Sequence, residues 1–281
     1  MTQVQESILD IFGYVHDLCE KHNIPYFSVG GTCLGAVRHH GFIPWDDDID
    51  IAIPIQYYDN FLEIAEKELP DHLKVFRCDR VKHYKQIFVK VHNINTTFIE
   101  DDTLAYPDAH TGIWVDVMPI SSIPSEKFKE RLFYFRMKYY YKMNWIRRYP
   151  LADMRSVKMR IMWLLARPFR GIIRFNHYSE KWLNMLRKYP LGSTELTGCT
   201  WWHHKGEWTF PSEIFTKTVP LPFEDRQMNC PAQYERFMRL QFGDYMKIPS
   251  PDEIQIHNPV YVSFDKPVKE FSMDDIRHDN S

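Results

Sequence analysis

Two nearby stretches decide the fold, Val-Gly-Gly-Thr at 29–32 and Pro-Trp-Asp-Asp-Asp-Ile-Asp-Ile at 44–51. In the second stretch, isoleucines alternate with polar or small residues, which is the period of a strand with one face in the core. Because residues i and i+2 of a strand lie roughly 6.5–7 Å apart on one face, we expect Asp46, Asp48 and Asp50 to share the other face. Crowded carboxylates repel one another and raise one another's pKa. The pattern indicates a site for Mg²⁺, or alternatively Mn²⁺, that also binds substrate phosphates; a solvated acidic turn is the ordinary alternative.

Gly30 and Gly31 lie between a predicted short strand at about 26–29 and a predicted helix at about 33–40. In this context, backbone N–H groups and a helix N-terminus bind phosphate, and Thr32 can cap the helix. A Gly-Gly pair alone is equally an ordinary tight turn. The aspartate-rich strand that follows favours the phosphate-binding interpretation.

Asp116 is a charged residue in the otherwise apolar strand predicted over 112–117. Such a residue is rarely buried without a partner. We interpret it as a third carboxylate beside the metal, or as the base that takes a proton from an attacking hydroxyl. A satisfied hydrogen bond in the core is the alternative.

Basic and aromatic residues complete the candidate site. Lys90, in the middle of a predicted strand, and Arg38 are candidate phosphate contacts, although Arg38 can equally be a surface residue. Trp45, Asp46 and Trp114 are candidates for supporting the metal ligands or for binding a quaternary ammonium, which needs an aromatic face. Further aromatic candidates for that role are Trp201, Trp202 and Trp208.

The hydrophobic pattern predicts one strand-rich unit followed by helices. Helices are expected at about 4–22, 33–40 and 55–69, and strands at about 26–29, 48–53, 74–78, 86–92, 96–100 and 112–117. The expected domains are a catalytic core over 1–124, a basic helical insertion over 125–205, and a C-terminal part over 206–281 that packs back on the core.

The net charge of −2 conceals a basic block at 126–188, which has 17 Lys or Arg residues and four Asp or Glu residues, a net of +13. Apolar residues alternate with arginines over 160–174, a pattern that suits a helix lying on anionic lipid. A solvated helical face is the alternative. Nucleic acid is not an expected partner because no base-reading motif accompanies the charge. No run reaches the roughly 18 apolar residues of a membrane-spanning helix.

The five cysteines show no CxxC motif, and residues 1–30 lack the features of a signal peptide. We therefore expect free thiols and a cytoplasmic protein, able to lie peripherally on the inner face of the plasma membrane. A zinc site built from Cys199, His203, His204 and Cys230 is the alternative use of these residues, although its spacing matches no known pattern.

The strand–Gly-Gly, Asp-x-Asp and single-Asp pattern resembles the DNA polymerase beta-like nucleotidyltransferase fold. More narrowly, Gly-Gly-Thr-Cys-Leu-Gly-Ala-Val-Arg-His-His-Gly-Phe-Ile-Pro-Trp-Asp-Asp-Asp-Ile-Asp-Ile-Ala at 30–52 is similar to the signature of the LicD family of phosphotransferases. Similar to that family too are 96–98, 115–119, and Phe-Gly-Asp-Tyr-Met at 242–246 followed by Pro249. The family includes bacterial cholinephosphotransferases and, more distantly, fukutin-type sugar phosphotransferases.

The resemblance implies an α+β fold with a mixed sheet, flanking helices and an added helical region. It implies that Asp48 and Asp50 bind Mg²⁺, that Asp116 is the third acid and that Gly30-Gly31 is the phosphate loop. The implied reaction transfers a phospho-alcohol group, phosphocholine by preference, from a CDP-linked donor to a sugar hydroxyl of a lipopolysaccharide, teichoic acid or capsule precursor, including lipid-linked acceptors. The alternatives are a nucleotidyltransferase that releases pyrophosphate from an NTP, and a non-catalytic glycan-assembly protein.

Overall fold

The computed structural model describes residues 1–84, 86–154, 156–198, 209–250 and 259–279. It confirms the α+β class with a mixed sheet. The described α-helices are α1 (Gln3–Lys21), α2 (Gly30–Arg38), α3 (Ile55–Glu68), α4 (Lys127–Arg148), α5 (Val157–Ala166), α6 (His177–Arg187), α7 (Tyr234–Phe242) and α8 (Met273–Asp279). The described strands are β1 (Phe27–Ser28), β2 (Asp50–Pro54), β3 (Leu73–Phe76), β4 (Val89–Asn93), β5 (Thr97–Ile99), β6 (Trp114–Ile123), β7 (Leu196–Gly198), β8 (Thr209–Pro211), β9 (Thr218–Phe223), β10 (Arg226–Pro231) and β11 (Tyr261–Ser263).

The central sheet has the strand order β1-β2-β6-β4-β3. Strands β2 and β6 are parallel, whereas β1, β4 and β3 join antiparallel to their neighbours. The far half of the long strand β6 pairs with β7, which pairs with β8. Because β2 and β6 are both inner strands of this order, residues at the start of each have a neighbouring strand on either side.

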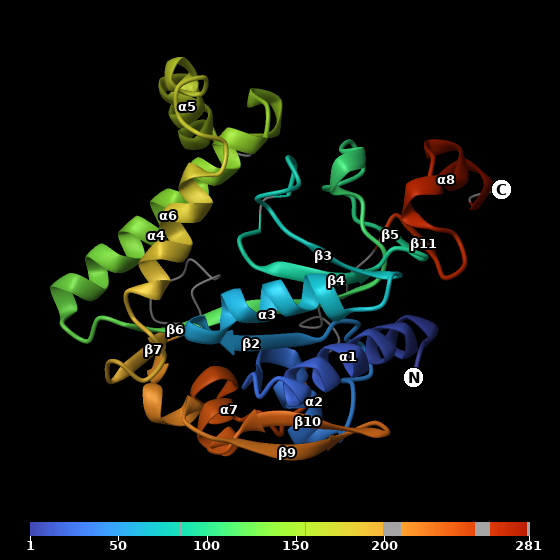
Figure 1. Ribbon diagram of the computed structural model, residues 1–281, viewed down its shortest axis with the longest axis vertical. Coiled ribbons are helices and arrows are strands. Elements are labelled where there is room, and N and C mark those ends of the chain that lie inside the picture. The colour runs from blue at the N-terminus through green and yellow to red at the C-terminus, as the bar shows by residue number, and fades with distance from the viewer. Residues whose placement is uncertain (85, 155, 199–208, 251–258, 280–281) are drawn as a thin grey trace.

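The core forms where the helices α1 and α3 pack against the inner strands (Figure 1). The apolar positions that the alternation assigns to the core, Ile49, Ile51 and Ile53, are all 0% exposed. Ala52, on the opposite face of β2, is also fully buried. The sheet is therefore covered on both faces along most of β2, whereas Asp50 at its start is partly exposed.

The segment 125–190 forms a helical arm of α4, α5 and α6, as the pattern predicts. Figure 1 shows α4 and α6 running side by side away from the sheet, with α5 at their far end. The far part of the arm has an apolar cluster of its own, around Met143, Ile146 and Met154. In the C-terminal part, Phe210, Phe237 and other residues join the main core cluster.

Two sequence expectations are corrected. Helix α2 begins at Gly30, with Val29 as its N-cap, so the glycines form its first turn and Thr32 is not its cap. Strand β2 begins at Asp50, because its pairing with β6 starts there. Asp46 and Asp48 thus lie in the connection before β2, and the three aspartates do not share one strand face.

The four described cysteines, Cys19, Cys33, Cys78 and Cys230, are free and buried, as expected. Cys199, His203, His204, Trp201, Trp202 and Trp208 lie outside the described residues, and with them the zinc alternative and three aromatic candidates. Within the described ranges, the structure contains no helix with both the length and the hydropathy required to cross a membrane.

Candidate active site

Asp50, Asp116 and Lys90 form a row across three adjacent strands. Asp50 of β2 is the register partner of Asp116 of β6, and Lys90 of β4 is the partner of Asp116 on the other side. Register partners in a sheet lie on the same face, and neighbouring strands are about 4.8 Å apart. The sheet therefore brings together one basic and two acidic residues that are far apart in the sequence.

The two carboxylates are held in an environment that opposes their ionisation. Burial, then the charges of Asp48, Asp116 and Asp46, raise the pKa of Asp50 well above its usual range, against the lowering effect of Lys90. Burial raises the pKa of Asp116 to about 6, with Lys90 acting against it and Asp48 adding to it. Because a shift of this kind reflects unfavourable negative charge, a cation bound here would relieve it.

Lys90 lies between Asp116 and Trp114. Its Nζ is 3.8 Å from Asp116 Oδ1 and 3.3 Å from the centre of the Trp114 ring. The Trp114 indole Nε1 donates to Asp116 Oδ2 at 3.3 Å. Asp116 Oδ1 is buried and accepts no hydrogen bond within the part of the chain that the structure describes. Trp114 thus supports both charged groups, and Asp116 Oδ1 retains capacity for a further ligand.

Asp46 lies against the first turn of α2. A β-carbon on Gly31 would stand 2.4 Å from Asp46 Oδ2, so any larger residue there would force this carboxylate to move. A negative side chain near a helix N-terminus is favourable. Thr32, instead of capping α2, uses its Oγ1 to accept the backbone N–H of Asp50 at 2.8 Å. The Gly-Gly-Thr turn therefore packs against the aspartate-rich connection and fixes the start of β2.

The remaining candidates lie around α2 and in the connection to β2. Arg38 Nη1 donates to the carbonyl oxygens of Tyr245 at 2.8 Å and Lys247 at 3.3 Å, which ties α2 to the C-terminal Gly-Asp-Tyr-Met segment. Burial lowers the pKa of Arg38. The Trp45 ring contacts the His39 ring edge to face, with 6.4 Å between the centres. These contacts place Arg38 at a junction of two sequence motifs, and its role toward phosphate remains a prediction.

A metal ion would have to be held by these carboxylates without a preformed cage. Among the residues that the structure describes, no group of three or more His, Cys, Asp or Glu side chains is arranged to hold a metal ion. Asp48 nevertheless raises the pKa of both Asp50 and Asp116, which places its charge near them. The three acids predicted from the sequence are thus neighbours, and their joint ligation of Mg²⁺ or Mn²⁺ remains a prediction.

Two residues near Asp116 were not predicted from the sequence. The Tyr84 hydroxyl is buried and has no hydrogen-bond partner among the described residues. Burial, then the charge of Asp116, raise its pKa well above the usual range. Glu100 also raises the pKa of Asp116. Tyr84 lies between two predicted strands and Glu100 is the last residue of the strand predicted over 96–100, and no spacing marks either one. Only the folding of β3, β4 and β5 reveals their position.

Comparison with known proteins agrees with this geometry. The family described as LicD/FKTN/FKRP, nucleotidyltransferase domain, matches residues 23–162, a segment that contains the whole Asp50–Asp116–Lys90 row. Residues 23–162 form a domain of the LicD family. The family resemblance drawn from the sequence is thereby confirmed.

Individual LicD relatives extend the match beyond that segment. The lipopolysaccharide cholinephosphotransferase LicD of Haemophilus influenzae is 26% identical over 271 residues, 92% of this chain and 96% of that protein. The ribitol 5-phosphate transferase FKRP of Mus musculus is 23% identical over 230 residues, 82% of this chain but 30% of that protein. The ribitol 5-phosphate transferase FKRP of Homo sapiens is 24% identical over 230 residues, again 82% of this chain and 30% of that protein. The chain is accordingly a phosphotransferase of this family.

Proposed function

We propose that this LicD-family chain transfers a phospho-alcohol group, phosphocholine by first preference, from a CDP-linked donor to a sugar hydroxyl of a cell-surface glycan precursor. The transferred group and the acceptor class follow the names of two relatives, a lipopolysaccharide cholinephosphotransferase and a ribitol 5-phosphate transferase. The CDP-linked donor is what the family resemblance implies. We also propose that the core is of the DNA polymerase beta-like type, because an acidic pair stands on the inner parallel strands β2 and β6.

The observation that carries the proposal is the row of Asp50, Asp116 and Lys90 across β2, β6 and β4. A phosphoryl group in transfer is negatively charged, and Lys90 provides a fixed positive charge within the row. Asp116 carries a carboxyl oxygen without a hydrogen bond in the described structure and a pKa raised to about 6. Asp116 can therefore either hold the metal as its third carboxylate or accept the proton of an attacking hydroxyl.

The donor set fits a hard divalent cation. Carboxylate oxygens are the ligands that Mg²⁺ prefers, and Mn²⁺ accepts the same ligands. Asp50 and Asp116, which are register partners on β2 and β6, would hold the ion together with Asp48 from the connection before β2. Among the described residues the three acids form no preformed cage, so ion binding would have to draw them together. When bound, the ion would neutralise charge on the donor phosphates.

Product analysis tests the proposed reaction. The protein is incubated with Mg²⁺, a sugar acceptor and CDP-choline, CDP-ribitol or CTP. We expect CMP release and phosphocholine attachment with CDP-choline. Pyrophosphate release from CTP with attachment of CMP would show a nucleotidyltransferase instead. Release of CMP with CDP-ribitol alone would keep the reaction class and replace the alcohol.

The metal proposal has a readout besides activity. Mg²⁺ should raise the melting temperature of the wild type, because a ligand that binds only the folded state stabilises it. Asp50→Asn should lose this shift, whereas Asp71→Asn, at an exposed carboxylate, should keep it. An equal shift in all three proteins would contradict metal binding by Asp50.

We further propose that the acceptor is presented at a membrane, with the protein in peripheral contact with the inner face of the plasma membrane. The basic block at 126–188 supports this, since it has a net charge of +13 and anionic lipids attract such segments.

A further inference from the structure

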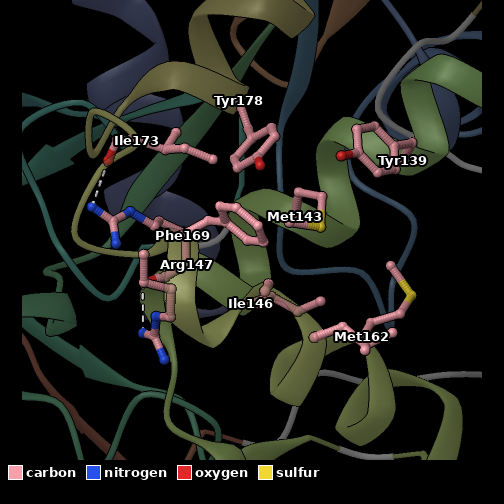
Figure 2. Close-up of a pocket in the computed structure, with 11 residues that line it drawn as sticks. Tyr139, Met143, Ile146, Arg147, Met162, Phe169, Ile173 and Tyr178 are labelled. Carbon is pink, nitrogen blue, oxygen red and sulfur yellow. Dashed lines mark hydrogen bonds between the residues drawn. The ribbon is translucent and has the colours of Figure 1, made fainter.

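The far end of the helical arm contains an apolar pocket of about 360 Å³ that lies apart from the row of acids. Figure 2 shows side chains from α4, from the segment after α5 and from α6 converging on it. Its apolar lining includes Met143, Ile146, Met162, Leu165, Phe169 and Ile173. Tyr139 and Tyr178 line the same pocket. A pocket of this composition suits an apolar chain.

Two arginines border this pocket, and neither has an acidic partner among the residues that the structure describes. Arg147 Nη2 donates to the carbonyl oxygen of Ile173 at 2.8 Å, and Arg170 Nη2 donates to that of Arg147 at 3.0 Å. Arg147 Nε is buried and donates to no atom that the structure describes. Burial and the charge of Arg147 lower the pKa of Arg170. Two neighbouring guanidinium groups that repel each other favour the binding of an anion such as a phosphate.

The surface around the pocket is apolar and exposed. Leu165 is 69% exposed, Phe169 56% and Ile172 80%. Ile161 and Leu164 of α5 are also more than half exposed. A contiguous exposed apolar surface normally marks a site of interaction. Within a segment of net charge +13, this surface is typical of a helix that lies in the interface of an anionic membrane.

We propose that the pocket between α4, α5 and α6 binds one acyl chain of an anionic phospholipid, with Arg147 and Arg170 at its phosphate, and that the end of the arm thereby docks on the membrane. The charge complementarity decides the occupant, since an apolar tail and a phosphate are both present in a phospholipid and the surrounding block repels a second copy of itself. The proposal does not depend on the transfer chemistry, because the pocket and the acids lie on different elements.

Vesicle binding tests the docking surface. Flotation of the full chain with phosphatidylcholine vesicles is compared with flotation with vesicles in which part of that lipid is phosphatidylglycerol. We expect binding to the anionic vesicles alone, weaker at high salt. Arg170→Gln should weaken it about fivefold, and Leu165→Gln with Phe169→Gln about tenfold or more. Arg131→Gln is the control for the charge, because it removes one positive charge about 24 Å from Arg147 along α4. Leu240→Gln, on the exposed face of α7, is the control for the apolar replacements.

The controls separate the pocket from general charge attraction. Full retention of binding by Arg170→Gln and by the Leu165/Phe169 variant, or equal losses in Arg131→Gln, would overturn the proposal. Because Leu165 and Phe169 are largely exposed, their replacement should leave folding unchanged. CMP release with a water-soluble acceptor should also be unchanged, which distinguishes failure of this proposal from failure of the proposed function.

A water-soluble lipid separates the pocket from the surface. Dihexanoylphosphatidylglycerol, held below the concentration at which it forms micelles, should bind the wild type and raise its melting temperature, whereas glycerol phosphate should not. Equal effects of both would show a free phosphate site and contradict the lipid proposal. Dimerisation that depends on Leu165 and Phe169 would assign the surface to a second copy and contradict it as well.

Discussion

Asp50 and Asp116 stand opposite each other on the parallel strands β2 and β6, although 66 positions separate them in the sequence. Parallel pairing in register places both carboxylates on the same face of the central sheet, near the start of the two strands. Lys90 extends the row on β4 and is the one basic group that the pairing brings to Asp116. The row therefore combines repulsion between two acids with partial compensation by one base. Because the row has two acidic groups and one basic group, its effect on the stability of the protein can be measured without substrate.

The pH dependence of stability reports the raised pKa of Asp116. Its pKa is about 6 in the folded protein, against 3.8 as the ordinary value. Between these values the folded state binds more protons than the unfolded chain. The stabilisation is complete below about pH 4 and is lost as the pH rises through about 6, by roughly 3 kcal/mol in total. Urea unfolding of the metal-free protein across this range should show the decline, and the raised pKa of Asp50 should extend it upward.

Asp116→Asn should flatten this decline, because an amide does not titrate. Addition of Mg²⁺ should also reduce it, since a bound cation favours the ionised carboxylates. An unchanged slope in Asp116→Asn would contradict the raised pKa.

Lys90 and Asp116 should be coupled in stability. The Nζ–Oδ1 distance is 3.8 Å, and the two side chains are only 9% and 13% exposed. Lys90→Met leaves the Asp116 carboxylate uncompensated and should cost about 3 kcal/mol, because removal of one partner of a buried pair leaves the other charge buried. The double variant with Asp116→Asn should cost less than the sum of the single costs. Lys74→Met, on β3 with half of its side chain exposed, is the control. Additive costs would show that the two groups do not interact.

Gly31 should be intolerant of a side chain. An alanine β-carbon would stand 2.4 Å from Asp46 Oδ2, so the carboxylate would have to move. We expect Gly31→Ala to lower the free energy of unfolding by about 1–3 kcal/mol and to lower turnover. Gly171→Ala, with no atom within 4 Å of the new carbon, is the matched control and should change stability by less than about 0.5 kcal/mol. Restoration of stability by Asp46→Ala in the Gly31→Ala background would locate the clash, and equal stability of both alanine variants would refute it.

The Tyr84 hydroxyl should matter to turnover and not to stability. It is buried without a hydrogen-bond partner among the described residues, so Tyr84→Phe removes a polar group that costs free energy to bury. Stability should be equal or higher. Turnover should fall about tenfold if the hydroxyl binds substrate beside Asp116. A loss of stability with unchanged turnover would give Tyr84 a structural role only.

Much of the fold follows from local sequence patterns. The alternation at Ile49, Ile51 and Ile53 predicted a buried strand, and the helical spacing near the N-terminus predicted α1; both are confirmed. The start of β2 was predicted too early. The strand begins where its pairing with β6 begins, and the sequence of β2 alone does not contain that information.

The candidate site was also predicted only in part from the sequence. Asp50, Asp116 and Lys90 were each suspected from an unusual charge in or beside an apolar strand, and the structure brings these three together. Tyr84 and Glu100 were missed because their relation to Asp116 arises from the arrangement of β3, β4 and β5. The function of Gly31 in making room for Asp46 also depends on a contact between separate segments.

The most direct test of the central claim is the rate of CMP release from CDP-choline, with Mg²⁺ and a sugar acceptor, in the wild type, Asp50→Asn, Asp116→Asn and the exposed control Asp71→Asn. The wild type and Asp71→Asn should release CMP at similar rates. Asp50→Asn and Asp116→Asn should remain folded and lose about a hundredfold or more in rate. Wild-type rates in either of these two variants would contradict the claim that the Asp50–Asp116 pair carries the chemistry.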